Sequence, residues 1–211
     1  MTEIIPIPIG QMNCYLLRQG SRHILVDAAS PGSERKLVRR VEALGLTPEA
    51  LDLLILTHYH ADHSGGAEYL REHHGVRIAM HPKDAVKARP LLPDGIQGQL
   101  LLTASKATIG AQLVVTPDYP LEAGLGLHGH GIEAEIVDLP GHTAGSIGIL
   151  FEDGRLICGD AMMNFTGPRL CLIAENFPQA RATLDRLLEM NITTVYPGHG
   201  RPFEMSQIKT T

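Results

Sequence analysis

Several features that would assign a chain to a special class are scarce or absent here. The 211 residues include no tryptophan, four phenylalanines and three widely spaced cysteines. An odd number of scattered cysteines does not make a disulfide framework. No apolar run approaches the roughly 18 residues that a membrane span needs, and the N-terminus lacks the basic and apolar segments of a signal peptide. We therefore expect a cytoplasmic protein in a reducing setting.

Positive charge is also in short supply. The chain carries 18 lysine and arginine residues against 23 acidic ones, which gives a formal net charge of -5, and the two signs are interspersed. This distribution gives no cluster of positive charge of the kind that binds nucleic acid. A chain of this length normally forms one domain, so we expect a single domain over residues 1–211. The expected partner is a small-molecule substrate, and the sequence leaves a homo-oligomer open.

Hydrophobic periodicity indicates a layered α/β architecture. Alternating or wholly apolar segments predict strands at 3–10, 13–19, 23–28, 51–56, 76–80, 132–139, 146–152, 155–160 and 193–197. Prolines in the first of these segments favour an edge strand. Amphipathic spacing predicts helices at 33–44, 65–74 and 178–190, with Ser33 as a cap, and His81-Pro82 opens a further short helix. Runs of strands with helices between them suggest sheets in the middle and helices outside.

Residues 85–131 differ from the rest of the chain. Proline, glycine and apolar residues follow one another there without a regular period. We interpret this segment as a partly helical insertion that covers another part of the domain.

Histidine is the residue that the chain has in excess, with eleven copies. Five of them, together with two aspartates, share one context, because each follows a predicted strand and lies near glycine. These residues are His58, His60, Asp62 and His63 after the strand 51–56, His142 after 132–139, Asp160 at the end of 155–160, and His199 after 193–197. Strand ends of a layered α/β protein converge at one edge, so we expect these side chains to meet there.

Imidazole and carboxylate groups are suitable ligands for zinc. Seven such residues are too many for one tetrahedral ion and about right for two ions that share a carboxylate. We therefore expect two divalent metal ions, zinc in the first place, with iron and manganese as alternatives. A single histidine in a loop is more often a surface residue, and HYHADH alone could be a surface chelating tract. The concurrence of four separate strand ends favours a metal centre.

The other histidines lack this context, and we expect structural roles for them. They are His23, His73, His74, His81, His128 and His130. For the last two, in the turn LHGHG, a reach from the insertion into the metal site stays open. Cys158 is interpreted as a buried small apolar residue, and Ser64 and Ser146 as turn or capping residues.

Four motifs in order, THYHADH, PGHTAGS, GD and PGHG, closely resemble those of the metallo-β-lactamase-fold superfamily of hydrolases. The resemblance covers the chain outside the insertion and implies a four-layer αββα sandwich with the metals at one edge of the paired sheets. It also implies the assignment of the ligands: His58, His60 and His142 to the first metal, Asp62, His63 and His199 to the second, and Asp160 as the bridge. Asp27 in ILVDAAS matches the family's early aspartate, which would orient a ligand loop.

Within the superfamily, the chain is similar to glyoxalase II-like thioesterases and lactonases. The resemblance implies a metal-bridging hydroxide that cleaves a thioester, ester or lactone, with Asp62 as the catalytic group that handles the proton. The chain ends shortly after His199, so we expect no C-terminal glutathione-binding extension. The pocket is then expected from residues 85–131 and the apolar loop 161–176, which favours a fairly apolar substrate. Tyr196 and Arg169 are candidates for polar substrate contacts.

Two other functions stay open at this point. One is a mononuclear iron persulfide dioxygenase, with the metal on His58, His142 and Asp160. The other is a non-catalytic binding module that the metal stabilises. Metal content and oxygen uptake distinguish the first alternative from hydrolysis, and the absence of any activity in the metal-loaded protein would favour the second.

Overall fold

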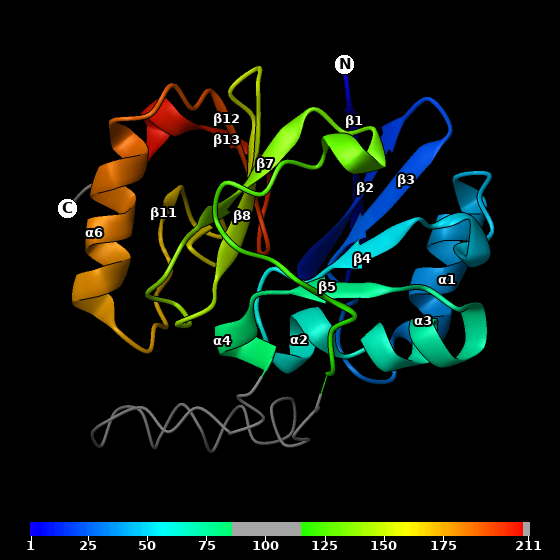
Figure 1. Ribbon diagram of the computed structural model, residues 1–211. Helices are drawn as coiled ribbons and strands as arrows, with labels where there is room; N and C mark the ends of the chain where they lie inside the picture. The colour runs from blue at the N-terminus through cyan, green and yellow to red at the C-terminus, as the bar shows by residue number, and fades with distance from the viewer. Residues whose placement is uncertain (86–114, 209–211) are drawn as a thin grey trace.

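The computed structural model describes residues 1–85 and 115–208, and two β-sheets lie at its centre (Figure 1). The first sheet has the strand order β1-β2-β3-β4-β5-β6. Its strands are β1 (Glu3–Ile9), β2 (Met12–Gln19), β3 (Arg22–Val26), β4 (Leu53–Ile55), β5 (Ile78–Met80) and β6 (Tyr119–Pro120). The first three pair antiparallel, and the pairs from β3 to β6 are parallel. The proline-bearing β1 lies at an edge, as the sequence predicts.

The second sheet has the order β13-β12-β9-β8-β7. Its strands are β7 (Ala134–Asp138), β8 (Ile147–Phe151), β9 (Leu156–Gly159), β12 (Thr194–Pro197) and β13 (Phe203–Glu204). A small separate hairpin pairs β10 (Met162–Met163) with β11 (Arg169–Leu170). Periodicity does not predict β10, β11 or β13, because strands of two residues carry no alternation to detect.

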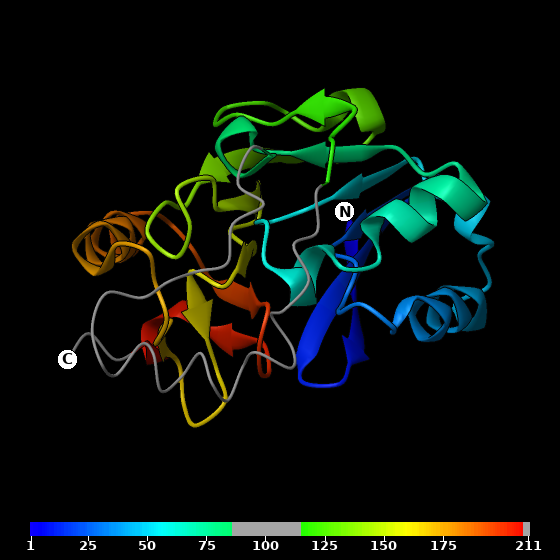
Figure 2. The ribbon, with the colours of Figure 1, turned by 90° about the horizontal axis from the view of Figure 1, so that it is seen from below.

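Helices cover the outer faces of the two sheets. The long ones are α1 (Glu34–Ala43), α3 (Ala67–His74) and α6 (Phe177–Leu188), and the short ones are α2 (Ala61–Ser64) and α4 (Pro82–Ala85), with 3₁₀ turns η1 (Pro48–Ala50), η2 (His128–His130) and η3 (Met205–Gln207). Figure 2 shows α1 and α6 on opposite sides of the molecule, with the sheets between them. Ser33 occupies the N-cap position of α1 as predicted, but its side chain makes no capping hydrogen bond. Among the described residues, no helix is long and apolar enough to cross a membrane.

The apolar residues form three layers that alternate with the four layers of secondary structure. The strand period of two divides single strands between layers. In β2, for example, Leu16 belongs to the layer under α1 and α3, whereas Leu17 belongs to the layer between the two sheets. In β9, Ile157 faces the same middle layer and Leu156 faces α6. This arrangement is the αββα sandwich of the metallo-β-lactamase fold that the motifs imply.

The predicted insertion at 85–131 divides into two parts. Residues 86–114 lie outside the described residues. The remainder contributes β6 to the first sheet, and Leu121 and Leu127 are buried in the middle layer. Residues 115–131 therefore contribute one edge strand to the first sheet and two leucines to the core. Sequence periodicity did not reveal this, because β6 is two residues long and the two leucines lie in irregular turns.

Candidate metal centre

The seven predicted metal ligands come from the ends of strands in both sheets. His58 and His60 follow β4, and Asp62 and His63 lie in the single turn of α2 directly behind them. The other three follow β7, β9 and β12, and they are His142, Asp160 and His199. Their ligand atoms form overlapping groups, and within each group the atoms lie within 4.8 Å of one another. The structure thus brings all seven side chains together, although 141 positions separate the first from the last in the sequence.

Three imidazole nitrogens converge in the first half of this cluster. The distances are 3.1 Å from His58 Nε2 to His60 Nδ1, 3.2 Å from His58 Nε2 to His142 Nε2, and 2.9 Å from His60 Nδ1 to His142 Nε2. The opposite nitrogens of two rings already have partners: His142 Nδ1 donates to the Ile173 carbonyl at 2.6 Å, and His58 Nδ1 lies 3.0 Å from Thr57 Oγ1. The converging nitrogens of these two rings are therefore lone-pair acceptors that face each other.

The second half combines two histidines with a carboxylate. His63 Nε2 lies 3.4 Å from His199 Nε2, and Asp62 Oδ2 lies 3.2 Å from His199 Nε2 and 3.9 Å from His63 Nε2. His199 Nδ1 donates to the Gln11 carbonyl at 3.0 Å, which leaves its Nε2 toward the cluster.

Asp160 lies between the two halves. Its Oδ1 is 3.3 Å from His63 Nε2, and its Oδ2 is 3.4 Å from His199 Nε2 and 3.7 Å from His142 Nε2. The Oδ1 atom is buried and has no hydrogen-bond partner among the described residues. A buried carboxylate oxygen without a partner is costly, and a cation is one way to compensate it.

This donor set fits two divalent cations. A tetrahedral ion with metal–nitrogen bonds of about 2.0–2.1 Å holds its nitrogens roughly 3.3 Å apart, close to the spacing of the first half. Converging lone pairs repel one another unless a positive charge lies between them. His58, His60 and His142 would hold one ion, Asp62, His63 and His199 the other, and Asp160 would contact both.

Comparison with known proteins identifies the family of the chain. Residues 7–199 match the Metallo-beta-lactamase superfamily. The chain belongs to this superfamily. The hydroxyacylglutathione hydrolase GloC of Haemophilus influenzae is 35% identical over 164 residues, which cover 76% of this chain and 71% of that protein. A Probable metallo-hydrolase of Methanocaldococcus jannaschii is 30% identical over 196 residues, with 89% and 87% covered.

Other relatives are longer than this chain. The chain spans 59% of the length of the Beta-lactamase-like protein 2 homolog of Drosophila melanogaster, to which it is 25% identical over 91% of its own residues. Among solved structures, the metallo-beta-lactamase family protein TTHA1429 of Thermus thermophilus shares the fold, with a TM-score of 0.74 at 24% identity, covering 98% of this chain and 76% of that one. TTHA1623 in a di-iron-bound form has a TM-score of 0.71 at 26% identity, with 96% of both chains covered.

In this superfamily member, Asp27 supports both halves of the cluster. Its Oδ2 accepts a hydrogen bond from His63 Nδ1 at 2.7 Å, and its two oxygens lie 3.1 and 2.9 Å from Thr57 Oγ1. Thr57 in turn contacts His58 Nδ1. Asp27 is buried and has a φ of 62°, a left-handed backbone that is strained for a residue other than glycine. Carboxylates that bond the outer nitrogen of a ligand histidine fix its orientation and tautomer.

His58 and His60 of the first half and His63 and His199 of the second have opposite shifts in pKa. Burial, reinforced by neighbouring histidines, lowers the pKa of His58 well below its usual value and that of His60 to about 3. Burial acts in the same direction on His63 and His199, but the carboxylates overcome it: Asp160 and Asp27 raise the pKa of His63, and Asp160 and Asp62 raise that of His199 to about 10. The half with the carboxylates therefore holds protons at neutral pH until a metal displaces them.

Gly198 explains the close approach of the last strand to the cluster. A Cβ atom at this position would lie 2.4 Å from Asp160 Oδ1 and 2.5 Å from His63 Cε1. A residue other than glycine at position 198 would displace one of these two side chains. The glycine before His199 is therefore a steric requirement of the centre.

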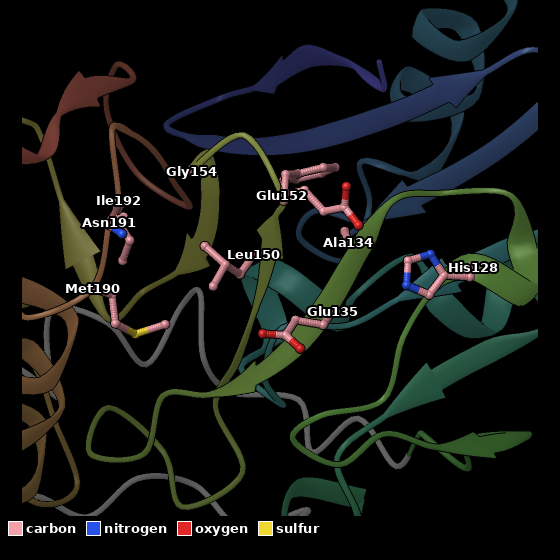
Figure 3. Close-up of a pocket in the computed structure, with 10 residues that line it drawn as sticks. His128, Ala134, Glu135, Leu150, Glu152, Gly154, Met190, Asn191 and Ile192 are labelled. Carbon is pink, nitrogen blue, oxygen red and sulfur yellow. The ribbon is translucent and has the colours of Figure 1, made fainter.

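His128 and His130, which the sequence leaves open as additional ligands, do not join the seven ligands of the metal centre. His128 and His130 form η2, and neither joins a potential metal-binding group among the described residues. His128 lines a separate pocket of about 250 Å³, together with Glu135, Leu150 and Met190 (Figure 3). None of the seven candidate ligands lines this pocket.

The candidate substrate contacts have other neighbours. The Tyr196 ring packs edge-on against Tyr15 at 5.8 Å in the middle apolar layer, and its hydroxyl interacts with Arg155. Arg169 lies half-buried in β11, and its Nε atom is buried without a hydrogen-bond partner in the described part of the chain. A role for either residue in substrate binding remains a prediction.

Sequence reasoning missed three residues that the fold places beside the ligands. Thr57 and Asp84 contact the ligand loops, and a ligand atom of Cys171 lies within 4.8 Å of those of His142 and Asp160. Burial raises the pKa of the Cys171 thiol to about 12. Only Thr57, which directly precedes His58, was visible as part of a motif; the other two approach through tertiary structure.

Proposed function

We propose that this superfamily member is a dinuclear metal-dependent hydrolase that cleaves an ester-type bond, namely a thioester, ester or lactone, in a small and fairly apolar substrate. The observation that carries the proposal is the position of Asp160 between two ligand triads, with distances of 3.3–3.7 Å to histidines of both. A single metal would leave one triad without a function. The reaction type is that of the hydroxyacylglutathione hydrolases among its relatives.

We infer zinc as the metal, because histidine and carboxylate ligands suit it. The di-iron form of TTHA1623 makes iron the alternative. The chemistry that two bound cations supply is the activation of water at neutral pH and the polarisation of a substrate carbonyl.

Asp62 is suited to handle the proton of the attacking water. Its side chain is 38% exposed, which makes it accessible to water, whereas Asp160 is almost fully buried. Burial favours the protonated form, but the charge on His63 and the hydrogen bond with His199 lower the pKa of Asp62 to about 2. The carboxylate is therefore ionised at neutral pH, the state that a group accepting a proton from water must have.

Apolar side chains beside the centre support an apolar substrate. Phe165 is 53% exposed, and its ring lies 5.5 Å from that of His199. Ile173 is 39% exposed, and its carbonyl group accepts the hydrogen bond from His142 Nδ1. Leu172, next to it, is 64% exposed. Exposed apolar residues gathered beside a polar centre are typical of a binding surface for an apolar group.

Metal analysis followed by a substrate panel tests the proposal. We expect two zinc ions per chain and turnover of acyl thioesters, esters or lactones, with catalytic efficiency that increases with acyl length. Asp62→Ala is expected to lose activity; its metal content, measured in parallel, separates loss of the proton acceptor from loss of a metal. Asp185→Ala, on the exposed face of α6, serves as the control.

Three results would contradict the proposal in different ways. Turnover of phosphodiesters or highly charged thioesters alone would exclude the apolar substrate. One iron per chain with oxygen uptake on persulfides would favour the dioxygenase. No turnover at full metal loading, with unfolding on metal removal, would favour the binding module.

A further inference from the structure

Asp84 is a buried carboxylate that takes no part in the proposed reaction. It lies in α4, two positions after Pro82, and is 2% exposed. Burial raises the pKa of Asp84, in opposition to the hydrogen bonds that it accepts. A buried acidic side chain is costly unless its oxygens are well bonded, so its hydrogen bonds indicate what it holds in place.

Those hydrogen bonds reach two different loops. Asp84 Oδ1 accepts from the backbone N–H of Gly145 at 2.7 Å. Its Oδ2 accepts from the Thr143 hydroxyl at 2.6 Å and from the backbone N–H of Tyr59 at 3.2 Å. Tyr59 stands between His58 and His60 in the sequence, and Thr143 directly follows His142. One carboxylate thus connects the two loops that carry the three converging imidazoles.

The packing around Asp84 leaves little room for another arrangement. A Cβ atom on Gly145 would lie 2.5 Å from Asp84 Oδ1, so the glycine in HTAGS allows the backbone to approach the carboxylate. Ser146 Oγ accepts from Thr143 N at 3.0 Å and lies 2.7 Å from Thr143 Oγ1, which holds the hydroxyl in line with Asp84. Each polar group at this junction has a partner, as expected of a rigid polar network.

We propose that Asp84 is a positioning residue that sets the spacing of His58, His60 and His142 and thereby the affinity of the protein for its first metal ion. The proposal rests on the metal centre described above. It predicts a selective effect, because Asp84 bonds the chain at Tyr59, ahead of α2, and has no described bond to α2 itself or to the loop that carries His199, whereas His63 in α2 is fixed separately by Asp27. Residues that orient metal ligands in this indirect way change metal affinity by about 10–100-fold when removed.

The test measures the dissociation constants of both metals, not catalysis. Metal-free Asp84→Ala and Asp84→Asn proteins are titrated with zinc against a chromophoric chelator. The effect is assigned by repeating Asp84→Ala in a His199→Ala background, in which the first site is intact, and in a His142→Ala background, in which it is not. We expect first-metal binding to weaken by about 10–100-fold for Asp84→Ala.

The two substitutions should differ in a defined way. An amide can still accept from Gly145 N and can donate to the Thr143 hydroxyl, but it cannot also accept from Tyr59 N on that side. Asp84→Asn is therefore expected to lie between the wild type and Asp84→Ala. Thr143→Val removes one donor and provides a second approach if Asp84→Ala does not fold.

Asp52→Ala is the matched control. Asp52 also accepts a backbone N–H, from His23 at 2.8 Å, and bonds Arg22, but directly before β4 and at the start of β3, at the strand ends opposite to the one that leads to the ligands. It should lower thermal stability and leave both metal affinities within about twofold of the wild type. Equal weakening of both metals by Asp84→Ala, or no weakening of the first, would overturn the proposal. Because no substrate is used, this outcome is independent of whether the protein proves to be a hydrolase.

Discussion

The two halves of the metal centre use the same ligand chemistry in different electrostatic settings. In the first, the outer nitrogens of His58 and His142 meet a hydroxyl and a backbone carbonyl, which are neutral. In the second, His63 is bonded to the carboxylate of Asp27, and Asp62 and Asp160 lie beside His199. Burial without a bonded carboxylate leaves His58 and His60 unprotonated and ready for a metal, whereas carboxylates hold protons on His63 and His199. The partner of each ligand therefore determines how a metal enters the site.

The largest effect is expected where the two halves meet. Asp160→Ala removes the carboxylate that lies within 4 Å of histidines of both triads and leaves His63 and His199 without their main counter-charge. We expect kcat/KM on the best ester-type substrate to fall by at least about 1,000-fold, which corresponds to about 4 kcal/mol of transition-state stabilisation. Metal content should fall below two ions per chain. Retention of two metals with nearly full activity would mean that the halves act independently.

Asp27→Asn is expected to weaken metal binding in the second half of the centre more than in the first. The amide keeps the shape of the side chain but removes the charge that faces His63 Nδ1. We expect the second metal to bind about 10–100-fold more weakly, and the first, which Asp27 reaches only through Thr57, to be affected less. Chelator competition at fixed pH measures both constants. An equal loss of affinity at the two sites would show that Asp27 acts on the whole centre and that the two halves do not differ in their dependence on it.

The two metals should also differ in their dependence on pH. A metal that enters the second half must displace protons from His199, whose pKa is raised to about 10, and from His63, whose pKa is also raised. Its affinity should increase with pH by about tenfold per unit for each displaced proton, between about pH 7.5 and 9. His60, with a pKa lowered to about 3, has no proton to lose in this range. Calorimetry in buffers of different ionisation enthalpy counts the released protons, and equal counts for the two metals would contradict the assignment.

The features that the sequence could predict are those written in local patterns. Strand-length apolar runs followed by glycine and histidine led to the ligand set, because such strand ends converge in any layered α/β fold. Helix α1 was visible from its amphipathic spacing. Leu121 and Leu127 were not visible as core residues, since their burial depends on the neighbouring sheet and not on a period. Asp84 was missed for the same reason: its three partners lie 25, 59 and 61 positions away.

Thr57 lies at the boundary between these two cases and provides the smallest of the expected effects. It precedes His58 in the motif, but only the fold shows that its hydroxyl connects His58 Nδ1 to Asp27. Thr57→Val keeps the shape of the side chain and removes one neutral hydrogen-bond partner, worth about 0.5–1.5 kcal/mol. We expect first-metal affinity to fall by about two- to tenfold and Thr57→Ser to restore it. A larger loss at the second metal would mean that the hydroxyl acts mainly by holding Asp27 against His63, and the neutral partners of the first half would then matter less than its burial.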